Sequence, residues 1–323
     1  MCTAIAWPTA SMAQAMSDTV TRASNAPFEV PSWLFPLPAT TEVADSVTLR
    51  RVPRSQATFT EARVRDPFAV ADWRPRTHPT MPGIVTHGRK PAVFACAYCH
   101  LPDGSGRPSN AMLAGLPAAY IVQQVADMKS RARRRAWPAP YVPSDDMRRI
   151  ADSATDEEVA AAARYFSGLV PRQRSQVVEA TEIPQALPSL GLYVPVPNGG
   201  HEPLGRRLIE MPADVLRHEL RDPWVGYVAY VPPGSIARGR GLATTGALPG
   251  VPACESCHGP GLRGAGPVPP LAGRPPSYLL RQLLAFRTGT RSTPASAPMR
   301  SVAALLEFDD MVAAAAYAGS RTP

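Results

Sequence analysis

The chain has 323 residues, enough for two or three domains with separate hydrophobic cores. Hydrophobic residues make up 45% of it and charged residues 19%, which excludes an intrinsically disordered chain, and no apolar run is long enough for a membrane-spanning helix. The formal net charge is +8 and there are 38 prolines, so we expect short helices, long loops and a mildly basic surface.

The first fifteen residues resemble part of an export signal. Residues 13–15 have the small-x-small pattern at which signal peptidase cuts, and a short apolar run precedes them. The charged segment that usually opens such a signal is missing. We therefore expect a truncated signal peptide over residues 1–15, a periplasmic location, and loss of Cys2 from the mature chain.

The next segment, residues 16–85, is rich in proline and has no sustained periodicity. We expect an irregular N-terminal extension that wraps over a neighbouring domain, with Trp33 and Trp73 as anchors. No motif with an evident chemistry lies within it.

From residue 86 to residue 170 the pattern becomes that of a small helical domain. The expected elements are a short helix around 88–90, the motif 96–100, a helix over 118–132, a proline-bearing loop that carries Met147, and a helix over 156–168. The last helix opens with Thr155, a favourable N-cap, followed by acidic residues.

The densest basic run is Arg131, Arg133, Arg134 and Arg135, after the second of these helices. It lacks the interleaved aromatic residues of a nucleic-acid site, so we interpret it as a solvated helix end. No nucleic-acid partner is expected.

Residues 171–234 differ from the helical domains. Short runs of β-branched and aromatic residues, at 176–179, 192–196 and 226–231, lie between Pro, Gly and Asn. They predict a small β-rich connector.

The helical pattern then returns over residues 235–323 as an internal repeat. Cys254 takes the place of Cys96, later residues match at the same offset, and the offset becomes slightly smaller before the methionines. The pairs, in chain order, are Leu113-Ala114-Gly115 with Leu271-Ala272-Gly273, Tyr120 with Tyr278, Gln124 with Gln282, Met147 with Met299, and Tyr165 with Tyr317. Its expected helices are 235–243, 277–287 and 308–319. The overall prediction is therefore a mainly α chain with two tandem copies of one fold.

Each copy carries the pattern Cys-x-x-Cys-His. Two thiols on one helical turn can reach the two vinyl groups on one edge of a porphyrin, with the histidine under the iron, and this is the attachment signature of haem c. A zinc site or a redox disulfide is the alternative, but each cysteine pair has its own histidine in its own repeat. We expect two covalently bound haems c, attached at Cys96, Cys99, Cys254 and Cys257, with His100 and His258 as proximal ligands.

Met147 and Met299 are the expected distal ligands. Each precedes the matching tyrosine of its own copy at the same spacing, whereas Met112, Met128 and Met311 are interpreted as packing residues. Ligation by Met and His leaves no open position at iron and suits electron transfer.

The other histidines, His78, His87, His201 and His218, have no matching partners in the repeat. We interpret them as surface or packing residues. An enzyme would need one of them at iron.

The tandem pattern resembles the bacterial di-haem class I c-type cytochromes, in which two cytochrome c domains are fused. The shared order is Cys-x-x-Cys-His, Leu-Ala-Gly, Tyr-x-x-x-Gln, Met, and an Ala-rich helix ending in Tyr. The resemblance covers roughly residues 86–170 and 235–323. It implies two cytochrome c-like helical domains.

The resemblance also implies that a proline carbonyl orients each proximal histidine. Pro269 fits, and the first copy has Ala111 there. A glycine is expected after the histidine; Gly259 fits and Leu101 does not, so we expect a differently shaped first pocket. Because the connector over residues 171–234 is much longer than a simple linker, we expect the two haems not to pack edge to edge.

The leading functional hypothesis is an exported electron carrier between a respiratory or dehydrogenase donor and a terminal acceptor. Its expected partners are redox proteins: a dehydrogenase, a quinol-oxidising complex or an oxidase, with peripheral association at membrane complexes. The alternatives are a cytochrome subunit docked on a periplasmic dehydrogenase, and a di-haem peroxidase or thiosulfate-oxidising enzyme.

Overall fold

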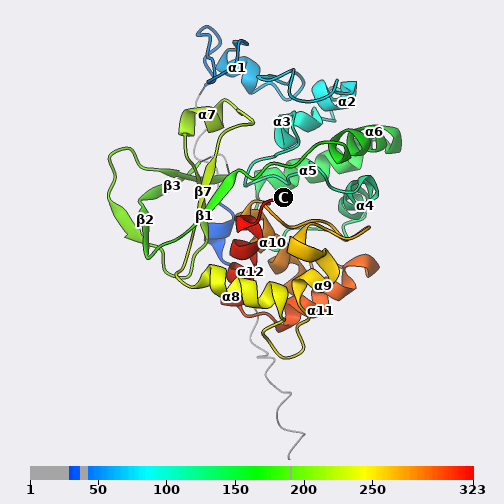
Figure 1. The fold of residues 1–323 in the computed structure, drawn as a ribbon. Helices are drawn as coiled ribbons and strands as arrows, with labels where there is room; N and C mark the ends of the chain where they lie inside the picture. The colour runs from blue at the N-terminus through cyan, green and yellow to red at the C-terminus, as the bar shows by residue number, and fades with distance from the viewer. Residues whose placement is uncertain (1–28, 37–42, 190) are drawn as a thin grey trace, which may run out of the picture.

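Two helical units and a β-rich connector make up the chain, which confirms the expected mainly α fold class (Figure 1). The computed structural model describes residues 29–36, 43–189 and 191–323, so the expected signal segment lies outside it. The helices of the first unit are α2 (Gly83–Thr86), α3 (Cys96–His100), α4 (Ala118–Lys129), α5 (Val142–Ser153) and α6 (Asp156–Ser167). Those of the second unit are α8 (Ser235–Thr244), α9 (Cys254–His258), α10 (Pro276–Arg287), α11 (Ala297–Leu305) and α12 (Phe308–Ser320).

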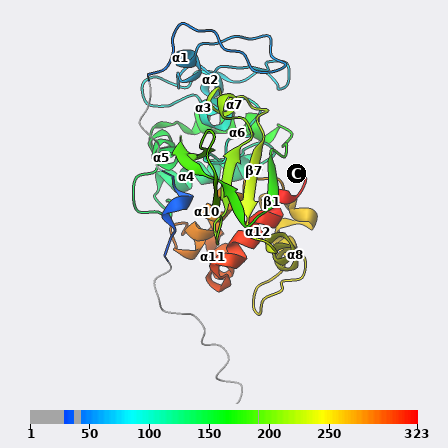
Figure 2. The ribbon, with the colours of Figure 1, turned by 90° about the vertical axis from the view of Figure 1, so that its left-hand side faces the viewer.

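The connector contains a three-stranded mixed sheet beside the helical units (Figure 2). Strand β7 (Tyr227–Val231) lies in the middle, parallel to β1 (Ser175–Glu179) and antiparallel to β6 (Ile209–Pro212). Alternate β7 side chains are buried, as a strand with one face on a core requires. Two ribbons and a helix complete it: β2 (Glu182–Pro184) with β5 (His201–Pro203), β3 (Ala186–Ser189) with β4 (Leu192–Pro195), and α7 (Val215–Glu219).

The repeat is visible in matching backbone contacts. The amide of Gly115 donates to the carbonyl of Phe166, and the amide of Gly273 donates to that of Ala318. The φ angles of the two glycines are +69° and +67°, a conformation that favours glycine at this turn. Each contact fastens the Leu-Ala-Gly turn to the closing helix of its own unit.

The helix before the first cysteine motif is not where the sequence predicted it. It spans α2 and ends before Gly88, which turns the chain with a φ of +62°. A Cβ at that glycine would lie 2.2 Å from the Val93 carbonyl oxygen, so residues 88–90 form a tight turn instead of a helix. Gly246 makes the matching turn in the second unit.

In its described residues, 29–36 and 43–82, the N-terminal extension is irregular apart from two short elements, η1 (Ser32–Leu34) and α1 (Glu61–Val64). Trp73 is buried, and its indole nitrogen donates to the Leu220 carbonyl at 2.7 Å. Trp33 lies edge-on to Phe308, with 6.2 Å between ring centroids. Both tryptophans therefore anchor the extension, but Trp73 does so on the connector and not on a helical domain.

The two helical units contact each other directly. Arg133 and Arg291, which occupy equivalent positions in the repeat, form an antiparallel bridge between the segments that follow α4 and α10. The amide of Arg134 donates to the Thr290 carbonyl, and the amide of Ser292 donates to the Ala132 carbonyl, each at 2.8 Å. The units touch although the connector between them is long, because the connector folds as a separate sheet beside this junction (Figure 1).

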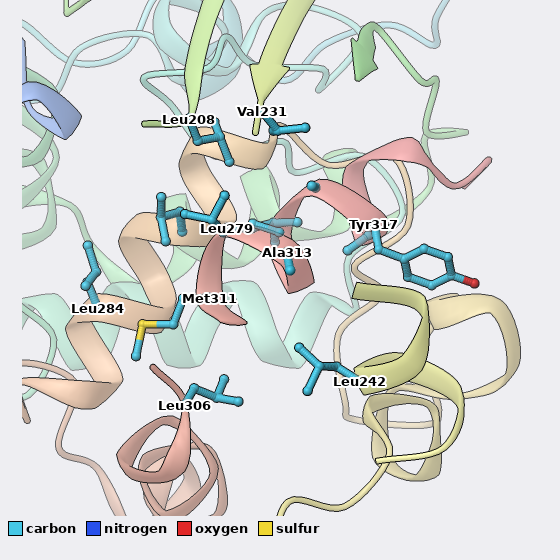
Figure 3. Packing of buried hydrophobic residues seen from close by; sticks show 14 of the residues in the cluster. Leu208, Val231, Leu242, Leu279, Leu284, Leu306, Met311, Ala313 and Tyr317 are labelled. Carbon is cyan, nitrogen blue, oxygen red and sulfur yellow. The ribbon is translucent and has the colours of Figure 1, made fainter. Parts of the chain in front are cut away.

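The core of the second unit depends on close contact between its first and last helices (Figure 3). Leu242 of α8 packs with Ala313 and Tyr317 of α12, and Met311 is fully buried nearby. None of the helices in the described ranges has the length and apolar character needed to cross a membrane.

Replacing Gly239 by alanine should separate α8 from α12. The new Cβ would lie 2.0 Å from the Ala313 carbonyl oxygen, so we expect a loss of about 1–3 kcal/mol in the free energy of unfolding. Gly241→Ala is the matched control, because its nearest neighbour would be at 3.4 Å and helical alanine gains roughly 0.5–1 kcal/mol over glycine. Urea unfolding of both variants measures this, and equal stabilities would contradict it.

Glu210 of β6 bonds to β1 within the connector and to α10 of the second helical unit. Its carboxylate accepts hydrogen bonds from the Ser175 hydroxyl and, at 2.6 Å, from the Ser277 hydroxyl. Burial raises the pKa of Glu210, so the folded state holds its proton more tightly than the unfolded state.

This pKa predicts that stability falls as the pH rises from the ordinary carboxyl range through the raised pKa of Glu210. The Glu210→Gln variant should lose that part of the slope of unfolding free energy against pH. Denaturant unfolding at several pH values checks the difference between the two proteins. Parallel pH profiles would contradict it.

Candidate functional site

Each cysteine motif forms a single helical turn that ends at its histidine. In the first unit the Nδ1 atom of His100 lies 2.8 Å from the Ala111 carbonyl oxygen. In the second, the Nδ1 atom of His258 lies 2.8 Å from the Pro269 carbonyl oxygen. Both rings are thus held by a backbone acceptor at Nδ1, which leaves Nε2 as the atom available to a metal.

Burial lowers the pKa of both histidines, although each carbonyl contact partly opposes this. The rings are therefore neutral near pH 7, as a ligand must be. Burial raises the pKa of Cys96 to about 12, which makes it a poor thiolate and a poor redox nucleophile.

The zinc alternative would need both cysteine pairs in one place. The structure puts them in separate units, and the four described cysteines form no disulfide bond. Within the described ranges, no group of three or more His, Cys, Asp or Glu side chains is arranged to hold a metal ion.

A cavity of about 570 Å³ opens beside α3 in the first unit. Cys96, Cys99 and His100 line it, and so does Met147. The volume falls in the range of roughly 300–1,000 Å³ that is usual for bound cofactors and ligands. The first set of expected site residues therefore shares one cavity.

The expected site residues of the second unit are more exposed to solvent. The His258 side chain is buried, whereas Cys254 is half-buried and Cys257 is exposed. Met299 is half-buried on α11. The matching His–carbonyl distance is the feature the two sites share most closely.

Both candidate methionines lie on helices, whereas the sequence predicted a loop. Met147 is in the first half of α5 and Met299 is near the start of α11. Proline stands at the first or second position of each helix, where its missing N–H costs nothing, so the prolines begin these helices instead of breaking them.

The packing methionines divide into two groups. Met112 and Met311 are buried, as expected. Met128 instead lines the first cavity, because the end of α4 forms part of the cavity wall. It is a second methionine on that wall, in addition to Met147, and the apolar pattern of its helix concealed this.

Leu101 and Gly259 occupy the same backbone conformation. Their φ and ψ angles are 62° and 156° for Leu101, and 75° and 164° for Gly259. This region is almost confined to glycine and costs another residue about 1–3 kcal/mol. The expected difference between the pockets therefore lies in the buried Leu101 side chain and not in the path of the chain.

A reciprocal set of hydrogen bonds joins the units at the cavity. The Arg133 guanidinium donates to Gln124 of its own unit and, at 3.0 Å each, to Tyr278 and Gln282 of the other. Arg291 donates to Gln282 of its own unit and to Gln124 and Tyr120 of the other, at 2.7 and 3.4 Å to these two. We call Arg133, Arg291 and these four partners the arginine junction.

The basic run is a solvated helix end only in part, because Arg131 and Arg134 are exposed whereas Arg133 and Arg135 are half-buried. Arg133 points into the junction, Arg131 pairs with Asp152 at 2.7 Å, and Arg135 pairs with Asp145. Sequence reasoning missed Arg133 because its partners Tyr278 and Gln282 belong to the other copy of the repeat. The equivalent positions of Arg133 and Arg291 in the two copies were the available signal.

The four remaining histidines are absent from the residues that line the cavity. His78 is held by Asp72, with Nε2 3.2 Å from a carboxylate oxygen. His218 is buried, with Nδ1 3.0 Å from the Tyr227 hydroxyl. His218 and His78 are therefore packing residues of the connector and the N-terminal extension.

Comparison with known proteins gives relatives over most of the chain, although no family model matches it. It is 28% identical over 233 residues to the thiosulfate dehydrogenase electron acceptor of Stutzerimonas stutzeri, covering 71% of this chain and 80% of the relative. It is 27% identical over 229 residues to cytochrome c4 of Azotobacter vinelandii, covering 69% of this chain and 82% of the relative.

A solved structure is also similar, the thiosulfate dehydrogenase TsdBA of Marichromatium purpuratum. The two share 31% sequence identity with a TM-score of 0.50, over 72% of this chain. The match spans only 38% of the dehydrogenase chain. Two attachment motifs, two helical units and these relatives all support the same assignment, a di-haem c-type cytochrome that carries electrons on two cytochrome c-like domains.

Proposed function

We propose that Cys96 and Cys99 attach the first haem, with His100 and Met147 as its axial ligands. The observation that carries this proposal is the cavity of about 570 Å³, which these four residues line together. Its volume and its largely apolar wall suit a porphyrin, and a neutral histidine with a free Nε2 suits iron.

Because the second unit repeats the first, its equivalent residues have the same roles. Cys254 and Cys257 attach the second haem, and His258 and Met299 ligate its iron. The equal distances of 2.8 Å from the histidines to Ala111 and Pro269 support the same role in both units. Haem supplies reversible one-electron chemistry between Fe(III) and Fe(II), and axial Met and His leave no position for a substrate.

The chain's own residues hold and insulate this cofactor. The carbonyl contacts fix the orientation of each ring and raise the basicity of the ligand nitrogen. Positive charge reaches the cavity wall from both units, through Arg133 of the arginine junction and Arg281 of α10. Such groups suit the acidic propionates of a haem.

The proposed electron donor is a dehydrogenase outside the cytoplasm, and the proposed location of this protein is the periplasm. Relatives named as electron acceptors of thiosulfate dehydrogenase, and the likeness to a solved thiosulfate dehydrogenase, support such a donor. The relatives support the location, because cytochromes c4 are di-haem cytochromes of the periplasm.

Replacing Met147 by leucine should remove the sulfur ligand of the first haem. We expect the weak far-red absorption of Met–Fe(III) to fall by about half, because one of two such sites is lost. Met128→Leu is the matched control on the same cavity wall and should leave the band unchanged. Loss of the band in the control instead would assign the ligand to Met128.

Met299→Leu should remove the other half of the same band, and the double variant with Met147→Leu should remove it all. Absorption spectra of the oxidised proteins at equal haem concentration measure this. A band that survives in the double variant would overturn both assignments.

Mixing the oxidised holoprotein with a thiosulfate dehydrogenase and thiosulfate should reduce its haems within the time of enzyme turnover. Stopped-flow absorbance follows the reduction, and thiosulfate without the enzyme is the control. Reduction at the same rate in the control would contradict transfer from the dehydrogenase.

A further inference from the structure

Three basic side chains gather where the connector covers the loop that follows His100. Arg107 comes from that loop, and Arg174 and His218 come from the connector. The guanidinium carbon of Arg174 lies 5.3 Å from the centre of the Tyr227 ring, and His218 contacts the Tyr227 hydroxyl at 3.0 Å. Arg174 also donates to the carbonyl of Gly106, the residue before Arg107, at 3.1 Å, so the connector meets the loop at this point.

Each of the three carries a buried nitrogen without a hydrogen-bond acceptor in the described part of the chain. These atoms are Nε of Arg107, Nη2 of Arg174 and Nε2 of His218. Arg174 uses its other nitrogens on the Val225 and Gly106 carbonyls. Arg107 is only 8% exposed and His218 only 1%, so bulk water does not satisfy these groups.

The two arginine atoms are N–H donors in every protonation state. Nδ1 of His218 lies 3.0 Å from the Tyr227 hydroxyl, and when that hydroxyl donates to Nδ1 the neutral imidazole carries its proton on Nε2. All three atoms are donors in that arrangement. Three N–H groups without acceptors in one buried region call for an acceptor.

The cluster also has uncompensated positive charge. Among the ion pairs of the described residues, none includes Arg107 or Arg174. Glu210 is the carboxylate whose charge reaches Tyr227, but it accepts from Ser175 and Ser277 instead. A buried guanidinium without a counter-ion is costly, and a bound anion removes that cost.

We propose that Arg107, Arg174 and His218 bind a small inorganic oxyanion of the sulfate or phosphate type, between the first haem unit and the connector. Such an anion supplies several acceptor oxygens to N–H groups that come from different directions. The site gives the connector a role, because the anion would join it to the loop beside the first cysteine motif. The site is separate from the cavity, whose lining includes none of the three residues.

The test uses the purified holoprotein, exchanged into a chloride buffer. Calorimetric titration with sulfate, and separately with phosphate, measures binding, and the thermal midpoint of unfolding is measured with and without each anion at constant ionic strength. We expect one site per chain and a higher midpoint with anion, because a ligand that binds only the folded state stabilises it. Ion chromatography of the denatured protein detects an anion that survived the exchange.

Arg107→Gln should weaken binding at least tenfold and abolish the rise in midpoint. Without anion, the same variant should unfold at an equal or higher temperature than the unchanged protein, because a buried unpaired charge is gone. Arg240→Gln removes the same charge from an exposed position on α8 and should bind normally. Arg107→Lys keeps the positive charge but loses the planar set of guanidinium donors. Its affinity for the anion should lie between those of Arg107→Gln and the unchanged protein.

An equal rise in midpoint for all four proteins would overturn the proposal, since it would reflect general salt stabilisation. The proposal would also be overturned if calorimetry detects no binding and the denatured protein releases no anion. The three nitrogens would then be assigned to ordered water. If calorimetry detects no binding but the denatured protein releases about one anion per chain, the site already holds its anion tightly. This result supports the proposal provided that the Arg107→Gln variant releases none.

Discussion

The arginine junction is the interaction on which the arrangement of the whole molecule depends. Arg133 and Arg291 each donate to residues of both helical units, and their side-chain acceptors are neutral tyrosine and glutamine oxygens. Backbone hydrogen bonds on either side of them fix the two chain segments in register. The two cysteine motifs therefore lie in one molecule with a defined relation, and not in two tethered domains.

The junction also explains why the charge of the interface remains positive. Hydrogen bonds to neutral oxygens satisfy the donors of a guanidinium but do not neutralise its charge. A buried charge without a counter-ion is costly. A cofactor with acidic groups, bound in the cavity that Arg133 lines, would supply the missing negative charge. The net charge of +8 of the chain is then partly a reflection of its cofactors.

The two units are similar in backbone and different in side chains. Leu101 adopts a glycine-like conformation that Gly259 adopts without strain, and the connector covers the loop after the first motif. The units thus place their histidines at equal distances from a carbonyl within unequal surroundings. Two sites with different environments are what a carrier needs if its electrons are to have a preferred direction.

Local sequence patterns predicted the elements that depend on interactions between neighbouring residues. The cysteine motifs, the helices α4, α6, α10 and α12, and the alternation in β7 all follow from spacing and capping, as with Thr155 before α6. The errors arose where distant segments decide the outcome. The turn at Gly88 depends on the Val93 carbonyl, and two partners of Arg133, Tyr278 and Gln282, belong to the second unit.

A third kind of residue lay outside any pattern. His218 was interpreted as a surface or packing residue, and it is buried against Tyr227 as such a residue can be. Its unused nitrogen, beside two arginines, becomes visible only when the loop after His100 and the connector are placed together. No spacing in the sequence encodes that contact.

The central claim is that each unit holds one closed haem that carries a single electron. A potentiometric titration of the purified holoprotein, followed by its visible spectrum, tests this most directly. We expect two reversible one-electron steps per chain, with both haems low-spin before and after reduction. A single one-electron step, or a reduced state with a high-spin haem open to ligands, would contradict it.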